Sequence, residues 1–335
     1  MVKRPKKITL GKKLGGKKNN SNNQTGKVES LIIFRCNCRC LMCSTGLQID
    51  RSRHDTDYHA IRPFEDVKKD IDKAANMNAR GFAFSGGEPT LRNDLPELAA
   101  YAREKNLGHI EVQSNGRMYI YKKLCQKLID SGVNRFVVSL HSHQEKIHDR
   151  IMGTKGTFKQ AVQGIKNLNE LGQKVNINVV LIKPNYQHLA QHVKFLIDNF
   201  DIGEIRLTMS MIEGSVARNP RALIPKMSDV GPHICRAIDI IKKSEKNIGC
   251  FVYNMVPCLV PGHEENINDM GQLDTLLIGP EFESSLDESR RGKKIKSASC
   301  RLCLYDDRCY GIWRSYASVF GLDELKPIKK PAQKG

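Results

Sequence analysis

The densest group of potential metal ligands in this sequence is a run of four cysteines within eight residues: Cys36, Cys38, Cys40 and Cys43. The group follows directly on the apolar run 31–34, as is typical of a strand that leads into a loop. Deprotonated cysteine sulfur is a soft ligand that suits both zinc and iron–sulfur clusters. One short loop would be strained in wrapping a four-thiolate zinc site, so the pattern favours an iron–sulfur cluster without excluding zinc.

A second motif, Gly86-Gly87-Glu88-Pro89, stands at the end of the next predicted strand. Paired glycines at a strand end let the backbone approach a ligand closely, and the neighbouring acid could accept a hydrogen bond from a cationic group. The same residues could instead form a tight turn in which Glu88 caps the following helix. From these residues alone, both interpretations stay open.

The spacing of Cys36, Cys40 and Cys43 is C-x3-C-x2-C, which resembles the signature of the radical S-adenosylmethionine (radical SAM) superfamily. The resemblance implies that these three cysteines bind a 4Fe–4S cluster and that Cys38 is not a ligand. The fourth iron then stays open for the amino and carboxylate groups of S-adenosylmethionine. The resemblance also implies that the second motif contacts the amino group of this cofactor, through Gly86, Gly87, Glu88 and Pro89.

The same resemblance makes three further residues candidates for binding the cofactor: Asn115, Ser139 and Arg150. Asn115 ends the third predicted strand, although an Asn-Gly pair is also an ordinary turn. Ser139 and a following arginine are expected to contact the carboxylate or ribose of the cofactor. The chain departs from the family pattern here, because Met152 stands at the arginine position and Arg150 comes two residues early. For His141 and His143 we expect surface or supporting roles rather than catalysis.

A later group of cysteines, Cys300, Cys303 and Cys309, forms a C-x2-C-x5-C pattern that resembles the SPASM and twitch extensions of radical SAM enzymes. This resemblance implies an auxiliary 4Fe–4S cluster with one more ligand from upstream, for which Cys258 is the first choice and Cys250 the second. No cysteine follows Cys309, so we expect a single, twitch-like cluster. Structural zinc on the same four thiols remains the alternative.

The elements that must position these residues follow from hydrophobic periodicity. Between residues 29 and 212, short β-rich runs alternate with amphipathic helical patterns, which indicates parallel strands joined by right-handed crossovers. The predicted strands are 30–35, 81–85, 109–114, 134–140, 175–182 and 203–210, with helices at 64–78, 94–105, 118–131, 157–171 and 186–199. Six such units predict a partial (βα)6 barrel of the TIM type, with function at the carboxyl ends of the strands.

The rest of the chain divides into an extension and two tails. Residues 213–325 are predicted to form a small cysteine-rich extension with helices near 233–245 and 312–320. Residues 1–28 and 326–335 are predicted to be basic tails, the first of them disordered. Nine Lys or Arg in residues 1–27 and four in the last ten carry most of the net charge of +18. The basicity therefore says little about the active site, although it could attract RNA or an acidic peptide.

The resemblance implies an enzyme that reductively cleaves S-adenosylmethionine to a 5′-deoxyadenosyl radical, which abstracts hydrogen from a substrate. Peptide or protein modification is the leading hypothesis, with a small metabolite or RNA as alternatives and an electron donor of the flavodoxin or ferredoxin type as a partner. The competing class is a non-catalytic zinc protein with nucleic-acid-attracting tails. No apolar run could span a membrane and no signal peptide is present, so we expect a cytoplasmic protein without a membrane partner.

Overall fold

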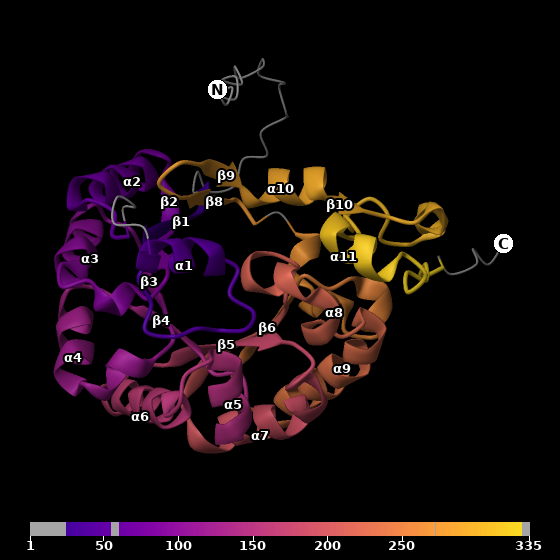
Figure 1. Ribbon diagram of the computed structural model, residues 1–335, viewed down its shortest axis with the longest axis horizontal. Helices are drawn as coiled ribbons and strands as arrows, with labels where there is room; N and C mark the ends of the chain where they lie inside the picture. Colours follow the sequence, from indigo (N-terminus) through magenta and orange to yellow (C-terminus); the bar gives the residue numbers. More distant parts are fainter. Residues whose placement is uncertain (1–24, 55–59, 272, 330–335) are drawn as a thin grey trace, which may run out of the picture.

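The computed structural model describes residues 25–54, 60–271 and 273–329, and its centre is one curved nine-stranded sheet (Figure 1). The strands lie in the order β7-β6-β5-β4-β3-β2-β1-β8-β9. The six predicted strands are β1 Thr25–Ile33, β2 Ala79–Gly86, β3 His109–Ser114, β4 Arg135–Ser139, β5 Val175–Leu181 and β6 Ile202–Met209. Each pairs in parallel with the next, which confirms the predicted partial barrel.

Helices cover the outside of the curved sheet (Figure 1). The predicted helices are α2 Phe64–Asn76, α3 Leu95–Glu104, α4 Lys122–Asp130, α6 Thr157–Glu170 and α7 Leu189–Asn199, with two short additions, α1 Gly46–His54 and α5 Glu145–Met152. In α2 the residues Val67, Ile71 and Ala74 are buried, at the spacing of one helical face. This single apolar stripe explains why the helix packs on the sheet while its other face meets solvent.

The strands present different residues to their two faces, because successive side chains of a strand point in opposite directions. In β5, Val175, Ile177, Val179 and Leu181 are fully buried in the hydrophobic core. Asn178 and Val180, on the opposite face, line a cavity inside the barrel. The carboxyl-terminal halves of the strands therefore supply polar side chains to the interior.

The sheet continues beyond the six predicted strands into the C-terminal third of the chain. Strand β7 Gly249–Tyr253 pairs in parallel with β6, β8 Thr275–Ile278 pairs in parallel with β1, and β9 Glu283–Ser285 is antiparallel to β8. One hydrophobic core joins residues from both sides of residue 212, such as Ile205 and Ile238. The boundary at 212 therefore remains a prediction, and the segment 213–325 contributes strands to the main sheet.

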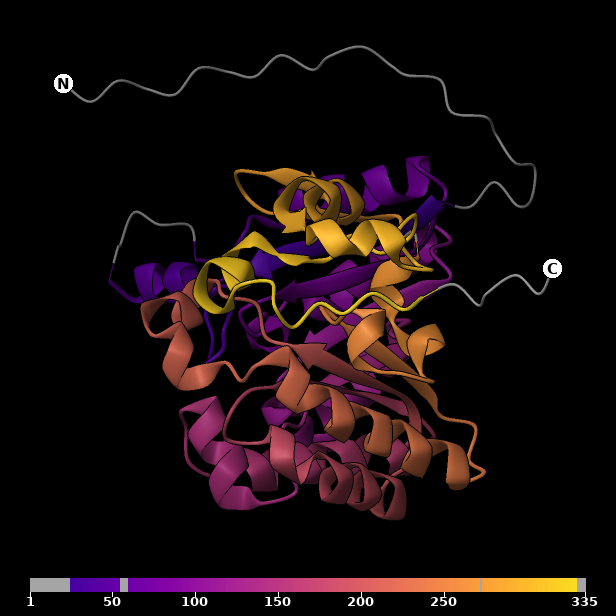
Figure 2. The same ribbon diagram turned by 90° about the vertical axis from the view of Figure 1, so that its right-hand side faces the viewer.

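The remaining C-terminal elements pack beside this end of the sheet (Figure 2). They are α8 Pro220–Leu223, α9 Met227–Lys243, α10 Leu286–Lys293, the short antiparallel pair β10 Lys294–Ile295 and β11 Ile312–Trp313, and α11 Arg314–Phe320. Helix α9 begins earlier than predicted and contains Pro232. Its buried face, which includes Val230, Ile234 and Ile238, packs against α7 and offsets the backbone hydrogen bond that proline removes.

The folded part of the chain reaches into both of the ranges that the sequence predicted to be tails. Strand β1 begins at Thr25, and the backbone N–H of Lys27 donates to the carbonyl of Asp274 at 3.0 Å. At the other end, the N–H of Leu304 donates to the carbonyl of Ile328 at 2.8 Å, so residues 326–329 belong to the folded part. Residues 1–24 and 330–335 lie outside the described residues. No helix in the described ranges is long and apolar enough to cross a membrane.

Candidate active site

The carboxyl ends of the first six strands, together with Leu277 of β8, surround a cavity of about 500 Å³. Three of the four clustered cysteines line it: Cys36, Cys40 and Cys43. Cys38 does not line it; this residue is only 2% exposed, and its sulfur lies 3.9 Å from Nη1 of Arg117. The structure thus separates the four thiols into three that share a cavity and one that faces the protein interior.

Hydrogen bonds from several elements hold the cysteine loop in place. The backbone N–H of Arg39 donates to the carbonyl of Met152 at 3.0 Å, and that of Leu41 donates to the carbonyl of Ile151 at 2.9 Å. The guanidinium of Arg117 donates to the carbonyl of Asn37. The end of α5 and the loop after β3 therefore determine the path of the loop, rather than the cysteines alone.

The thiols are strongly perturbed by one another and by burial. The hydrogen bond with Cys38 and burial raise the pKa of Cys36. For Cys38, the hydrogen bond with Cys36 lowers the pKa, but the bond with Cys40 and burial outweigh it and raise the pKa to about 12. Burial also raises the pKa of Cys43. Thiols crowded in this way lose their protons when a cation binds them, so metal loading would release protons from this loop.

The two glycines of the second motif are required by close contact with the end of β1 and with the start of the cysteine loop. Gly86 has φ +120°, and a Cβ there would lie 2.3 Å from the carbonyl oxygen of Ile33. A Cβ on Gly87 would lie 2.3 Å from the carbonyl oxygen of Arg35. Both glycines line the cavity. The close approach that excludes a side chain, however, is to the backbone of β1 and the cysteine loop rather than to a ligand.

Glu88 and Pro89 lie behind the cavity instead of lining it. Glu88 is fully buried, and its carboxylate accepts hydrogen bonds from the N–H of Thr90 at 3.1 Å, the hydroxyl of Ser114 at 2.8 Å and the N–H of Asn115 at 2.8 Å. Burial raises its pKa despite these bonds. The structure therefore shows the Glu88 side chain as a cap, and its direct contact with the cofactor stays a prediction. Pro89 begins the short 3-10 helix Pro89–Leu91.

Of the three further candidates, the structure brings two into the cavity. Asn115 and Ser139 line it, and the side-chain amide of Asn115 donates to Asn37 Oδ1 at 2.7 Å. Arg150 is exposed and lies outside the cavity, and its contact with the cofactor stays a prediction. Helix α5 instead presents Met152, whose sulfur lies 3.7 Å from that of Cys40, because Ile151 and Met152 form the buried face of this helix.

His141 lines the cavity, whereas the sequence predicts a surface or supporting role for it. It is 2% exposed and lines the cavity, and its Nδ1 accepts a hydrogen bond from the N–H of Val180 at 3.2 Å. Burial and the neighbouring His148 and His192 hold its pKa well below the usual value. Because Nδ1 accepts, the ring proton of the neutral imidazole is on Nε2. Its position two residues after Ser139, on the same face of an extended chain, was the available signal.

The later cysteines converge on a second, much smaller cavity of about 20 Å³. Four thiols line it: Cys258, Cys300, Cys303 and Cys309. Cys250 is buried in β7 and does not line this cavity. The structure therefore brings Cys258, the first choice for the upstream ligand, together with the three later cysteines. Burial, with smaller contributions from the other three thiols, raises the pKa of Cys258 to about 11. These four thiols line and enclose one narrow cavity.

Both donor sets consist of thiols, which are ligands of iron–sulfur clusters and also of zinc. Within the ranges that the structure describes, no three His, Cys, Asp or Glu side chains have the geometry to hold one metal ion. In a cluster the thiolates are spread over separate irons. Three thiols at an open cavity suit a cluster with one accessible iron, and four enclosing thiols suit a fully ligated cluster.

Comparison with known proteins places this arrangement in a family. Residues 30–196 match the family model of the Radical SAM superfamily. The chain belongs to the radical SAM superfamily. The matched segment of this radical SAM chain includes the cysteine loop and the ends of β1 to β5 at the larger cavity, whereas the four later cysteines lie outside it.

Individual relatives of this radical SAM chain cover it in part. It is 36% identical to Fe-coproporphyrin III synthase from Methanosarcina barkeri, over 46% of the chain and 37% of the relative. It is 25% identical to PqqA peptide cyclase from Bradyrhizobium diazoefficiens, over 59% of the chain and 50% of the relative. The chain therefore spans half or less of the length of these curated relatives.

Among solved structures, the fold is similar to that of SuiB from Streptococcus suis bound to S-adenosylmethionine. The TM-score is 0.65 and the sequence identity 17%, with 91% of this chain and 77% of that chain covered. This likeness extends through the C-terminal segments and supports the fold assignment for nearly the whole described chain.

Proposed function

We propose that this protein reductively cleaves S-adenosylmethionine and uses the resulting radical to abstract hydrogen from a substrate. The observation that carries the proposal is the division of the cysteine loop, in which Cys36, Cys40 and Cys43 line the 500 Å³ cavity while Cys38 does not. A 4Fe–4S cluster on these three thiolates would supply the electron that cleaves the cofactor to methionine and a 5′-deoxyadenosyl radical.

The side chains around the cavity bind and orient the cofactor in this proposal. Asn115 and Ser139 offer polar groups at neighbouring strand ends, and His141 offers an Nε2–H donor that does not change its charge near neutral pH. Gly86 and Gly87 border the cavity with backbone alone. Met152 contributes an apolar wall beside Cys40, which helps to exclude water from a reactive radical.

We propose that the later cysteines hold one auxiliary 4Fe–4S cluster through Cys258, Cys300, Cys303 and Cys309. Because four thiolates would ligate every iron of the cluster, the site suits electron transfer better than direct binding of a substrate. An electron donor of the flavodoxin or ferredoxin type is the partner that the reductive step requires.

For the substrate class we propose peptide or protein modification. The similarity to PqqA peptide cyclase over more than half of the chain supports this class. The greater identity to Fe-coproporphyrin III synthase, over a shorter segment, supports a small molecule as the second candidate.

The test is anaerobic purification of the full chain followed by iron, sulfide and zinc analysis, and an assay of S-adenosylmethionine cleavage with a chemical reductant. Two clusters predict about eight irons per chain and formation of 5′-deoxyadenosine. Zinc without iron would support the non-catalytic alternative and refute the proposal.

Two matched substitutions make the assay specific. Cys40→Ser removes a thiol that lines the cavity and should abolish cofactor cleavage, whereas Cys38→Ser alters a thiol outside the cavity and should retain cofactor cleavage.

A third substitution tests the auxiliary site: Cys303→Ala should remove only the auxiliary iron, about half of the total. Loss of cleavage in Cys38→Ser, or of all iron in Cys303→Ala, would contradict the assignment of two independent sites.

A further inference from the structure

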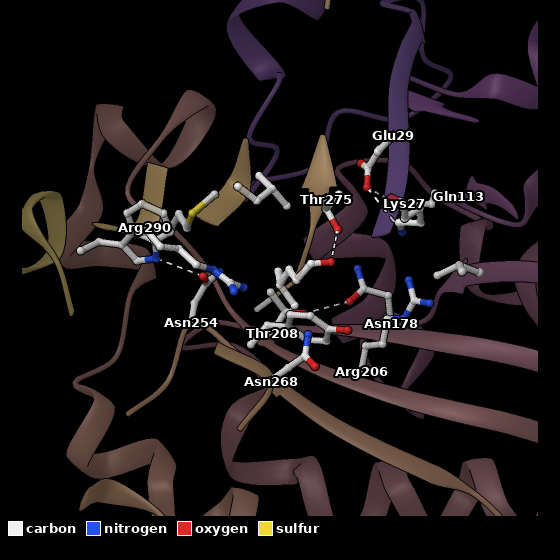
Figure 3. A pocket seen from close by; sticks show the side chains of 16 residues that line it. Lys27, Glu29, Gln113, Asn178, Arg206, Thr208, Asn254, Asn268, Thr275 and Arg290 are labelled. Atoms are coloured by element: carbon white, nitrogen blue, oxygen red, sulfur yellow. Dashed lines mark hydrogen bonds and ion pairs between the residues drawn. The ribbon is translucent and has the colours of Figure 1, made fainter. Parts of the chain in front are cut away.

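A further cavity of about 350 Å³, here called the side cavity, adjoins the proposed cofactor cavity inside the barrel (Figure 3). The side cavity and the cofactor cavity share five lining residues, Glu29, Gln113, Val137, Asn178 and Met211. A molecule in the side cavity would therefore meet a molecule in the cofactor cavity at this shared boundary. The volume is within the usual range for sites that bind small molecules or single side chains.

One end of this cavity contains a buried guanidinium with an unused donor. Arg290 is 5% exposed, and its Nη2 donates to Oδ1 of Asp269 at 2.9 Å. Its buried Nη1 has no hydrogen-bond partner among the described residues. The ion pair from Nη1 to Oδ1 of Asp287 is 3.8 Å long, which is beyond hydrogen-bonding distance. An unpaired buried N–H is unfavourable, and a ligand oxygen would relieve this cost.

The neighbouring acids are already engaged by other groups. Asp269 also accepts a hydrogen bond from Lys294 at 2.6 Å, so one carboxylate serves two cations. The carboxylate of Asp287 accepts hydrogen bonds from the backbone N–H groups of Leu273 and Asp274. Neither acid is therefore placed to satisfy Nη1 of Arg290.

At the opposite end of the cavity the charged side chains have partners. Figure 3 shows Arg290 and Asn254 at one end and Lys27, Glu29 and Gln113 at the other. There, Lys27 donates to Glu111 at 3.1 Å and Glu29 accepts from Gln113 at 3.1 Å. Charged groups at that end satisfy one another, which leaves Arg290 as the point of attachment that the geometry favours.

An aromatic wall stands beside Arg290. The indole N–H of Trp313 donates to Oδ1 of Asn254 at 3.0 Å, and Nζ of Lys294 lies 5.1 Å from the centre of its ring. These contacts hold the ring in one orientation, where it lines the cavity together with Leu273 and Leu286. The site thus combines a charged donor with an adjacent apolar surface.

We infer that this cavity binds the substrate through a carboxylate that pairs with Nη1 of Arg290, while an apolar group of the substrate packs against Trp313. A carboxylate is favoured over a neutral acceptor because hydrogen bonds between two charged groups are about twice as strong. The bound molecule then extends from Arg290 toward the shared boundary, where a C–H bond would face the cofactor cavity. The use of the site in catalysis rests on the proposed function, but the binding itself does not.

Trp313 provides a direct measurement, because it is the only tryptophan in the chain. Its fluorescence is titrated in the anaerobically purified full-length protein, without reductant, with 3-phenylpropanoate, N-acetylphenylalanine and the amide of each. We expect both carboxylates to change the fluorescence with saturation, and both amides to bind at least about tenfold more weakly. Equal binding of acid and amide, or no response to either acid, would overturn the inference.

Two substitutions test the role of Arg290. Arg290→Lys keeps a cation beside Asp269 but removes Nη1, and should weaken carboxylate binding at least about tenfold. Arg291→Lys is the matched control, because Arg291 is exposed and outside the cavity, and it should bind as the unaltered protein does. Unchanged binding in Arg290→Lys would refute the assignment.

Circular dichroism would reveal whether Arg290→Lys misfolds. A third variant tests the site independently in that case. Leu286→Phe narrows the cavity from another wall and should abolish the fluorescence response; an unchanged response would place the probe elsewhere and refute the site. Failure of cofactor cleavage with intact carboxylate binding would refute only the proposed function. Cofactor cleavage without carboxylate binding would refute only this inference.

Discussion

The backbone N–H of Asn115 at the end of β3 donates a 2.8 Å hydrogen bond to the buried carboxylate of Glu88 that follows β2. The same carboxylate accepts from Thr90 and Ser114. Glu88 therefore joins two neighbouring strand ends directly behind the cavity into which the cysteines face. Its contribution to the site is to position Asn115 and the backbone of the Gly86-Gly87 turn.

We predict that Glu88→Gln lowers the free energy of unfolding by about 1–3 kcal/mol, because the new amide group would face N–H and O–H donors instead of accepting from them. Chemical denaturation under anaerobic conditions measures the change. Glu104→Gln, at an exposed position, is the control and should change stability by less than about 0.5 kcal/mol. Equal stability of the two variants would mean that the Glu88 bonds contribute nothing net.

We predict that Gly87→Ala displaces the cysteine loop, since its Cβ would lie 2.3 Å from the carbonyl oxygen of Arg35. The cost of such overpacking is about 1–3 kcal/mol. The variant should lose iron from the first site and keep the iron of the auxiliary site, as iron analysis and electron paramagnetic resonance would show. Gly292→Ala is the control, because a Cβ there meets nothing within 4 Å. Full iron content in Gly87→Ala would contradict this role.

We predict that His141 acts as a neutral hydrogen-bond donor toward the cofactor cavity. His141→Gln retains an N–H at a similar reach and should keep most of the affinity for S-adenosylmethionine, whereas His141→Phe should weaken it about tenfold. Equilibrium dialysis measures the affinity, and nitrogen NMR of labelled histidine reports whether the proton is on Nε2. Arg150→Ala should have no effect, since Arg150 lies outside the cavity. A weaker affinity in that variant would instead support the expectation from the sequence.

We predict an acid-sensitive contribution to stability from Glu111. Burial alone would raise its pKa, but Lys27 and Arg206 outweigh burial and hold the pKa well below the usual value. A lowered folded-state pKa means that the ion pairs stabilise the protein above the unfolded pKa of about 4.3, and that this stability is lost as the pH falls below it. Glu111→Gln should be less stable at pH 7 by about 3–5 kcal/mol, with the difference shrinking toward pH 3. A difference that is independent of pH would contradict the ion-pair explanation.

The sequence indicated the chemistry of this protein through features that are local along the chain. The C-x3-C-x2-C and C-x2-C-x5-C spacings lie within single loops, and the alternation of strands and helices is visible as a change of hydrophobic period. These patterns predicted the partial barrel and the order of its first six strands. They could not show that β8 would pair with β1, because that pairing joins segments about 250 residues apart through backbone groups that every sequence has.

Only the tertiary structure decided which side chains share a cavity. Cys258 meets the later cysteines and Cys250 does not, Met152 lies beside Cys40 while Arg150 lies outside the cavity, and Glu88 points behind the cavity that His141 enters. The physical reason is that the direction of a side chain depends on how its element packs against distant ones. Ligand spacing within one loop is a covalent property that the sequence determines, whereas convergence of residues from several strands exists only after folding.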